Sequence, residues 1–132
     1  MAEPPLLLLD EVRRALRFEK DLADRALAQL RPEDWHARLD PEANSIAIIV
    51  RHLHGNMQSR WTQFLSADGE KAWRDRDGEF EASAATPDAL LAVWEQGWAT
   101  VFDAVDTLTA EDLDRTITIR GEPHSVARAC FG

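Results

Sequence analysis

The sequence predicts an all-α domain, an antiparallel four-helix bundle whose fourth helix is only a stub. Three long segments carry apolar residues at the three- and four-residue spacing of an amphipathic helix. The connections between these segments are too polar for buried strands. The chain has 132 residues, of which 45% are hydrophobic, so we expect residues 1–132 to form one domain.

The first helix is predicted over residues 6–30. Its apolar positions recur on one face: Leu9, Val12, Leu16, Ala23, Ala26, Leu27 and Leu30. Pro32 ends this helix, because proline disfavours the helical conformation of the residue before it. Pro32 can also open a short turn that contains Glu33 and Asp34.

The second helix, over residues 45–66, has the strongest helical pattern in the chain. Its apolar positions are Ile46, Ile49, Val50, Leu53, Met57, Trp61, Phe64 and Leu65. Either Asn44 or Ser45 can cap its first turn. The charged stretch 70–81 follows and shows no periodicity, so we interpret it as a long connection.

The third helix is predicted over residues 87–108. Thr86 supplies a capping hydroxyl, Pro87 suits the first helical position, and Asp88 places an acid in the first turn. One face then carries the apolar residues Leu90, Trp94, Trp98, Val101, Phe102, Val105 and Leu108.

A short motif is repeated after the first and third helices. The segment Leu30-Arg-Pro-Glu-Asp-Trp is echoed by Leu108-Thr-Ala-Glu-Asp-Leu. If the two halves are related, residues 118–125 correspond to the loop before the second helix. A fourth helix is then expected to begin near residue 125 and to remain a stub.

Charge and composition exclude some classes of function. The net charge of −9 opposes binding to nucleic acid or to anionic membranes. The apolar run Leu6–Leu9 is too short for a signal peptide or a membrane span, so we expect a cytoplasmic protein. The lone Cys130 excludes an intramolecular disulfide.

Four histidines are candidate metal ligands: His36, His52, His54 and His124. A catalytic zinc generally needs three protein ligands. His52 and His54 diverge by about 160° on a helix, so they cannot share one ion. Spacing alone does not choose between a core-edge role for His54, a partly solvated role for His52 and a metal role for either.

Several segments resemble one known family. They are the run from Asn44 to Trp61, Phe64-Leu65, 68–71, 73–77, 79–81, Trp94-Glu-Gln-Gly-Trp98 and Ile119-Arg-Gly-Glu-Pro-His-Ser-Val126. Together they resemble an uncharacterised branch of the DinB-like superfamily, a domain of unknown function. Relatives in that superfamily include bacterial thiol-dependent transferases and isomerases. The resemblance spans nearly the whole chain, from about residue 8 to 126.

The resemblance implies a four-helix bundle, often dimeric, that holds a divalent metal such as zinc or nickel. One ligand would be a histidine of the second helix and two would come from the fourth helix. The ligand of the second helix maps to His52, and the other two have no counterpart in this sequence. His124 precedes the fourth helix and is expected to be structural. We therefore expect no tightly bound metal in the chain as written.

Two functional hypotheses follow. One is an ancestral metal-dependent enzyme, a transferase of a small thiol, that is not catalytically competent as written. The other is a non-catalytic helical module that works through dimerisation. For either one we expect a homodimer, in which a second copy covers an apolar groove bordered by Leu53, Trp61, Trp98 and Val105. The roles of His54 and of Trp73, which lies in the polar connection, stay open.

Overall fold

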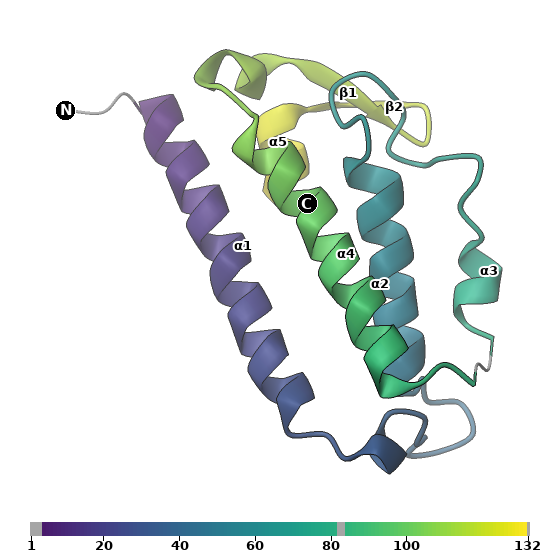
Figure 1. Ribbon diagram of the computed structural model, residues 1–132. Helices are drawn as coiled ribbons and strands as arrows, with labels where there is room; N and C mark the ends of the chain where they lie inside the picture. The colour runs from purple at the N-terminus through teal and green to yellow at the C-terminus, as the bar shows by residue number, and fades with distance from the viewer. Residues whose placement is uncertain (1–3, 82–83, 132) are drawn as a thin grey trace.

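The computed structural model describes residues 4–81 and 84–131 (Figure 1). These residues form, in order, α1 (Pro4–Ala28), η1 (Pro32–Asp34), α2 (Ile46–Trp61), α3 (Arg76–Glu79), α4 (Pro87–Asp106), η2 (Ala110–Asp114), β1 (Thr116–Ile119), β2 (Glu122–Ser125) and α5 (Val126–Phe131). The chain is mostly helical, as the sequence predicts. Within the described residues, no helix combines the length and the apolar character needed to cross a membrane.

The three long helices begin close to their predicted starts because capping side chains define two of them. The Ser45 hydroxyl accepts a hydrogen bond from the backbone N–H of Ile48 at the start of α2. The Thr86 hydroxyl does the same for Ala89 at the start of α4, and Pro87 occupies the first helical position. The predicted caps are thereby confirmed, with Ser45 rather than Asn44 at α2.

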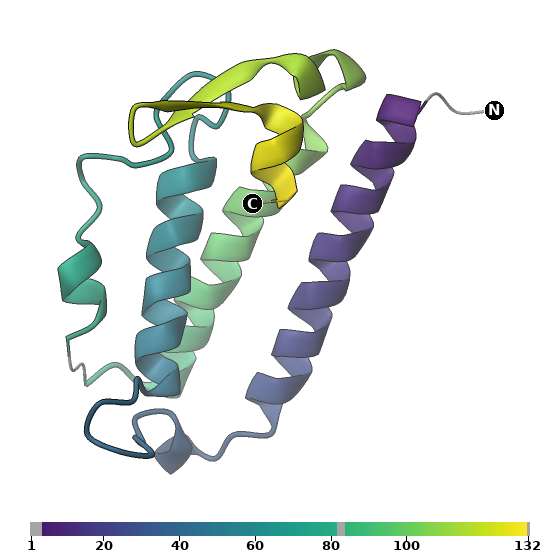
Figure 2. The same ribbon diagram turned by 180° about the vertical axis from the view of Figure 1, so that it is seen from behind.

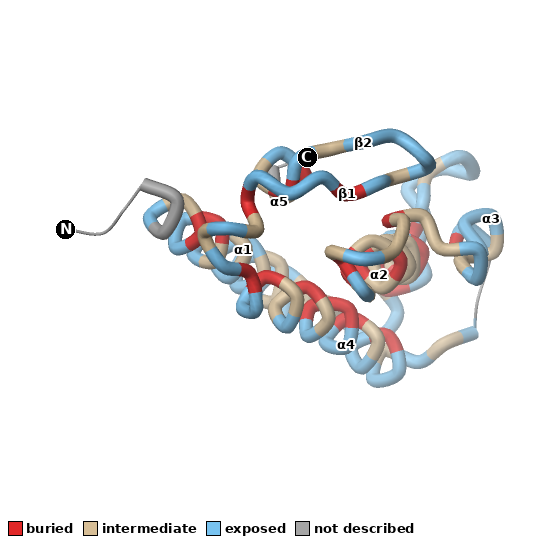
Figure 3. The backbone as a smooth tube through the Cα atoms, turned by 90° about the horizontal axis from the view of Figure 1, so that it is seen from above, coloured by how far each residue is buried: buried red, intermediate tan, exposed pale blue. Residues whose placement is uncertain are grey.

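The long helices lie side by side (Figures 1 and 2), and buried residues from all three belong to one core cluster. Helices α2 and α4 pack closely and α1 runs beside α4 (Figure 3), while the hairpin and α5 lie at one end of these helices (Figures 1 and 2). The core residues on α4 are Leu90, Trp94, Trp98, Val101 and Val105, which confirms the predicted face. Their partners include Leu9, Val12, Val50, Met57 and Trp61.

The repeated acidic motif forms the same turn twice. In η1, the Asp34 carboxylate accepts the backbone N–H of Arg31 at 2.9 Å. In η2, the Asp112 carboxylate accepts the backbone N–H of Thr109 at 2.8 Å. In both turns the carboxylate of the third residue accepts the backbone N–H of the residue just before the turn, so the sequence echo corresponds to a structural repeat.

Each repeated turn also attaches the helix that follows it. The carbonyl of Trp35, which lies just after η1, accepts the N–H of Ala47 in α2 at 2.8 Å. The carbonyl of Arg115, just after η2, accepts the N–H of Val126 in α5 at 2.9 Å. Helix α5 therefore begins where the repeat predicts, near residue 125.

The loop predicted over residues 118–125 is wrong, because this segment belongs to an antiparallel hairpin of β1 and β2. Three β-branched residues precede Ile119, and the alternation buries Ile117 at 5% exposure. The turn places Arg120 and Gly121 at φ values of 55° and 76°, the two positive angles that a tight hairpin turn requires. Glycine meets this requirement without strain.

Three further expectations fail, two on α2 and one in the connection that follows it. The helix ends at Trp61 rather than near residue 66, because Thr62 is extended and Gln63 has a positive φ of 49°. Within the connection predicted over 70–81, residues 76–79 form the short helix α3. Ile49, assigned to the buried face, is 45% exposed because the packed face is centred on other α2 residues: Ala47, Ile48, Val50, Met57 and Ser59.

The prediction of an exposed apolar groove is also wrong, because three of the four residues expected to border it are buried. Trp61, Trp98 and Val105 are 9%, 7% and 0% exposed, and Leu53 is partly buried against the core. The hairpin and α5 contribute Ile117, Val126 and Ala129 to the same core cluster. The described residues therefore cover these side chains within one chain.

Candidate functional site

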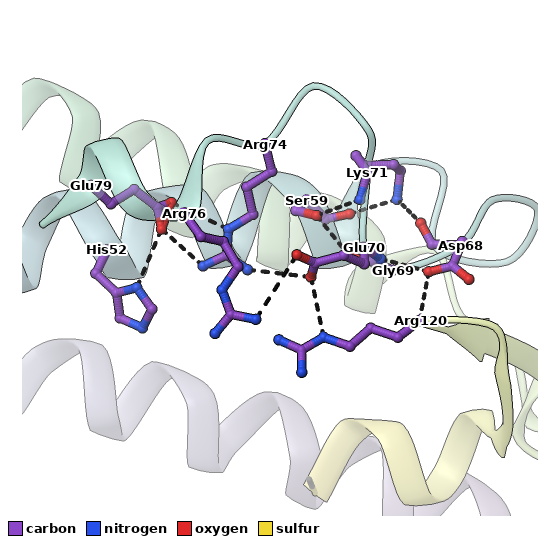
Figure 4. A network of polar contacts seen from close by, with 10 residues as sticks. All are labelled: His52, Ser59, Asp68, Gly69, Glu70, Lys71, Arg74, Arg76, Glu79 and Arg120. Carbon is purple, nitrogen blue, oxygen red and sulfur yellow. Dashed lines mark hydrogen bonds and ion pairs between the residues drawn. The ribbon is translucent and has the colours of Figure 1, made fainter.

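His52, the metal ligand that the resemblance predicts, lies on α2 opposite α3. Its Nδ1 lies 3.3 Å from Oε1 of Glu79, and its side chain is 30% exposed. The Phe80 ring packs against the imidazole, with 4.8 Å between ring centroids. Figure 4 shows Nδ1 turned toward the carboxylate, which leaves the second ring nitrogen, Nε2, on the other side of the ring.

The Glu79 carboxylate, which contacts His52, is itself held in place by Arg74. Its side chain is 10% exposed, and Arg74 donates to both carboxylate oxygens, from Nε at 3.2 Å and from Nη2 at 3.0 Å. The Arg74 side chain is only 3% exposed. Such a bidentate pair holds both partners in one geometry, so Glu79 presents one oxygen to the imidazole in a set orientation.

The carboxylate of Glu79 also lies against the backbone of α2. A methyl group at Gly55 would overlap Oε2 and Cδ of Glu79. Arg51, one turn earlier on α2, donates to the carbonyls of Gly78 and Glu81 at 2.9 and 2.7 Å and thereby holds the end of α3. The glycine and the arginine together let the α3 segment approach α2 closely enough for Glu79 to reach His52.

The polar network extends from Arg74 toward the hairpin (Figure 4). Nη1 of Arg74 lies 3.6 Å from the Glu70 carboxylate, which is also 3.9 Å from Nη1 of Arg76. Arg120, in the hairpin turn, places Nε 3.8 Å from the same carboxylate. Three guanidinium groups from separate positions therefore surround one carboxylate.

Ser59 anchors the loop that carries this network. Its hydroxyl is 0% exposed, donates to the carbonyl of Gly69 at 2.8 Å and accepts the backbone N–H of Lys71 at 2.9 Å. The Lys71 ammonium donates to the carbonyls of Ser59 and Asp68. Partial burial lowers the pKa of Lys71, which the nearby Asp68 charge only partly offsets.

Asp68 ties the same loop to the hairpin. Its carboxylate accepts the backbone N–H groups of Glu70, Gly121 and Arg120 at 2.7, 2.8 and 2.8 Å. These hydrogen bonds, chiefly those from Glu70 and Gly121, lower the pKa of Asp68. The loop and the hairpin turn are thus joined through one ionised side chain.

The other histidines lie apart from His52. Nε2 of His54 lies 3.0 Å from Oε1 of Gln96 on α4, so the two neighbouring histidines face different elements, as predicted. Nε2 of His36 lies 2.8 Å from the Ala85 carbonyl, and His124 lies in β2 opposite Ile117. Among the residues that the structure describes, no three His, Cys, Asp or Glu side chains are grouped as a metal site would require.

The sequence singled out His52 as a candidate ligand but gave no indication of the residues that contact it. Glu79 lies 27 positions along the chain, in a segment with no periodicity, and Arg74 lies in the same segment. The signal for them was Gly55 in the middle of a strong helical pattern, since a close contact with another segment is one reason for glycine inside a helix. Trp73, whose role was open, lies in the same segment and is 60% exposed.

Fold and site together define a mostly helical protein with an imidazole–carboxylate–guanidinium cluster beside its second long helix. The chain belongs to the family described as "Protein of unknown function (DUF1572)", whose model matches residues 6–131. Comparison with curated proteins gave no significant match, and comparison with solved structures gave none either.

Proposed function

We propose that this chain is a DinB-like protein in which His52 is the ligand that α2 contributes to a divalent-metal site. The hydrogen bond between Nδ1 of His52 and Glu79 supports this proposal most directly. Histidines that bind metals commonly donate their other ring N–H to a carboxylate, which fixes the tautomer and raises the basicity of the coordinating nitrogen. Nε2 of His52 would be that nitrogen.

At this position the described residues offer one ligand for such a site, His52. Glu79 is already engaged by Arg74, so it serves as the orienting carboxylate rather than as a second ligand. A bound zinc or nickel ion would supply Lewis acidity that lowers the pKa of a coordinated small thiol or water. One ligand of the usual three gives only weak binding, so we expect the isolated chain to lose zinc on dialysis.

Zinc titration followed by side-chain ¹⁵N NMR tests this proposal. We expect zinc to shift the Nε2 resonance of His52 at submillimolar to millimolar concentration and to leave His54, whose Nε2 contacts Gln96, unchanged. His52→Ala should remove the response and His54→Ala should retain it. Glu79→Gln should weaken zinc binding by about tenfold, in line with the loss of an orienting carboxylate.

One result would overturn the proposal, and another would change only the number of ligands assigned to the site. A response centred on His36 or His124 that persists in His52→Ala would place the metal elsewhere. One equivalent of zinc that survives dialysis and disappears in His52→Ala would contradict the single-ligand expectation and indicate that a second subunit completes the site.

A second candidate function is a non-catalytic helical module that dimerises, with the four-helix bundle completed between chains. It is favoured by one observation on α1, where Phe18 and Leu22 lie one turn apart and are 60% and 47% exposed. Sedimentation velocity at micromolar concentration should show a dimer that Phe18→Glu with Leu22→Glu converts to a monomer. A monomer in the unmodified chain would eliminate this candidate.

A further inference from the structure

A cavity of about 320 Å³ lies between α2, the loop after it and the hairpin. Asn56 and Arg60 line it from α2, Glu70 and Arg74 from the loop, and Arg120 from the hairpin turn. Gly69, Ile119, Glu122 and His124 complete the lining. The metal proposal uses none of these groups as ligands.

The charges around this cavity are arranged for an anion. Glu70 lies 3.6, 3.9 and 3.8 Å from guanidinium nitrogens of Arg74, Arg76 and Arg120, respectively. All three separations exceed the length of a direct N–H···O hydrogen bond, which is about 2.7–3.2 Å. One carboxylate thus sits among three cations without a close hydrogen bond to any of them.

Specific local contacts hold the arginines Arg120 and Arg74 in place at the cavity. Arg120 occupies a left-handed backbone conformation, with φ of 55°, that a non-glycine residue adopts only under strain. Asp68 holds it there by accepting the N–H groups of Arg120 and Gly121. Arg74 is held by its two hydrogen bonds to the Glu79 carboxylate. The chain as a whole carries a net charge of −9, so this local gathering of arginines does not follow from composition.

We propose that this cavity binds the oxyanion group of a small molecule, a phosphate or a carboxylate, and that Glu70 is its internal competitor. Guanidinium groups suit planar, bidentate recognition of both oxyanions. The incoming group would take the place of the Glu70 carboxylate beside Arg120, and the Asn56 amide and His124 offer further polar contacts. Glu122 also lines the cavity, but it is exposed and its charge is screened by water.

NMR titration with inorganic phosphate and with succinate, at constant ionic strength in chloride, tests the proposal. We expect saturable shifts of the Arg120 Nε–Hε signal, with a dissociation constant of about 1 mM for the better ligand. Arg120→Gln should weaken binding by about tenfold or more. The matched control, Arg14→Gln, removes an exposed arginine of α1 that pairs only with Glu11 among its described salt bridges, and it should leave binding unchanged.

Glu70→Gln distinguishes a binding site from a structural cluster. Removal of the competing carboxylate should tighten anion binding by at least about fivefold, the effect of one unit charge about 4 Å away in water. A purely structural role predicts no gain. Tighter binding of phosphate than of succinate assigns a phosphate ester as ligand, and the reverse order assigns a carboxylate. Linear shifts with both anions, or unchanged or weaker binding in Glu70→Gln, would overturn the proposal.

Discussion

Trp94 on α4 donates its indole N–H to Oδ1 of Asp24 on α1, with 2.8 Å between Nε1 and Oδ1. The second oxygen of Asp24 accepts from Lys20, which also reaches Glu95 on α4. Partial burial raises the pKa of Asp24, but the hydrogen bonds from Lys20 and Trp94 outweigh it, and the pKa lies below its ordinary value. The first and third long helices are therefore joined through one carboxylate.

Trp94→Phe should lower the free energy of unfolding by about 1–3 kcal/mol, because it removes a donor from a carboxylate and reduces packing in the core. Urea unfolding followed by circular dichroism measures the change. Trp73→Phe alters a tryptophan that is 60% exposed and should change stability by less than about 0.5 kcal/mol. Equal effects of the two substitutions would contradict the role assigned to the Trp94–Asp24 hydrogen bond.

Ser59→Ala should destabilise the protein by about 1–3 kcal/mol. The substitution leaves the Gly69 carbonyl and the Lys71 N–H without the fully buried hydroxyl that now serves both. Hydrogen exchange should increase at the Lys71 amide in particular. Ser66, which is exposed a few residues later, provides the control, since Ser66→Ala should leave both stability and exchange unchanged.

Stability should depend on the ionisation of Asp68. The pKa of this carboxyl is lowered in the folded protein, so its contribution is present above the unfolded value of about 3.9 and is lost as the pH falls through the folded value. Asp68→Asn should therefore be less stable than the unmodified chain at pH 7, and the difference should shrink below about pH 4. Urea unfolding at several pH values measures this difference. A gap that stays constant down to pH 2 would disprove the assignment.

Gly55→Ala should destabilise the protein, although alanine in a helix interior normally gains about 1 kcal/mol over glycine. The added methyl group would overlap the Glu79 carboxylate, and relief of such a clash typically costs about 1–3 kcal/mol. A double-mutant cycle with Glu79→Ala measures the coupling. In the Glu79→Ala background, Gly55→Ala should lose its penalty, and a penalty that persists there would place the clash elsewhere.

The helices were predictable because their signals are local. Apolar periodicity and the caps at Ser45 and Thr86 act within one or two turns, and α4 spans Pro87–Asp106 where 87–108 was predicted. The hairpin was missed because β1 has only four residues and its turn is Arg-Gly rather than the commoner Asn-Gly. Four alternating residues are too few to separate a strand from a loop.

The candidate site was predictable only in part. His52 was proposed as a ligand from the resemblance, because the helical pattern alone did not distinguish it from His54. The contacts with Glu79 and Arg74 depend on how residues 62–81 fold back along α2, and tertiary packing of that kind leaves no periodic trace in the sequence. The exposure of Ile49 has the same origin, since the partner of a helix face decides which apolar residues are covered.

The contact between Gly55 and Glu79 constrains the order in which evolution can change these two positions. A larger residue at position 55 is sterically acceptable only after Glu79 has been shortened, whereas the shortening of Glu79 removes the carboxylate to which the buried Arg74 guanidinium donates two hydrogen bonds. Each single step therefore passes through a less stable intermediate. Positions 55, 74 and 79 should consequently covary as a set across the family, with glycine, arginine and glutamate retained or replaced together.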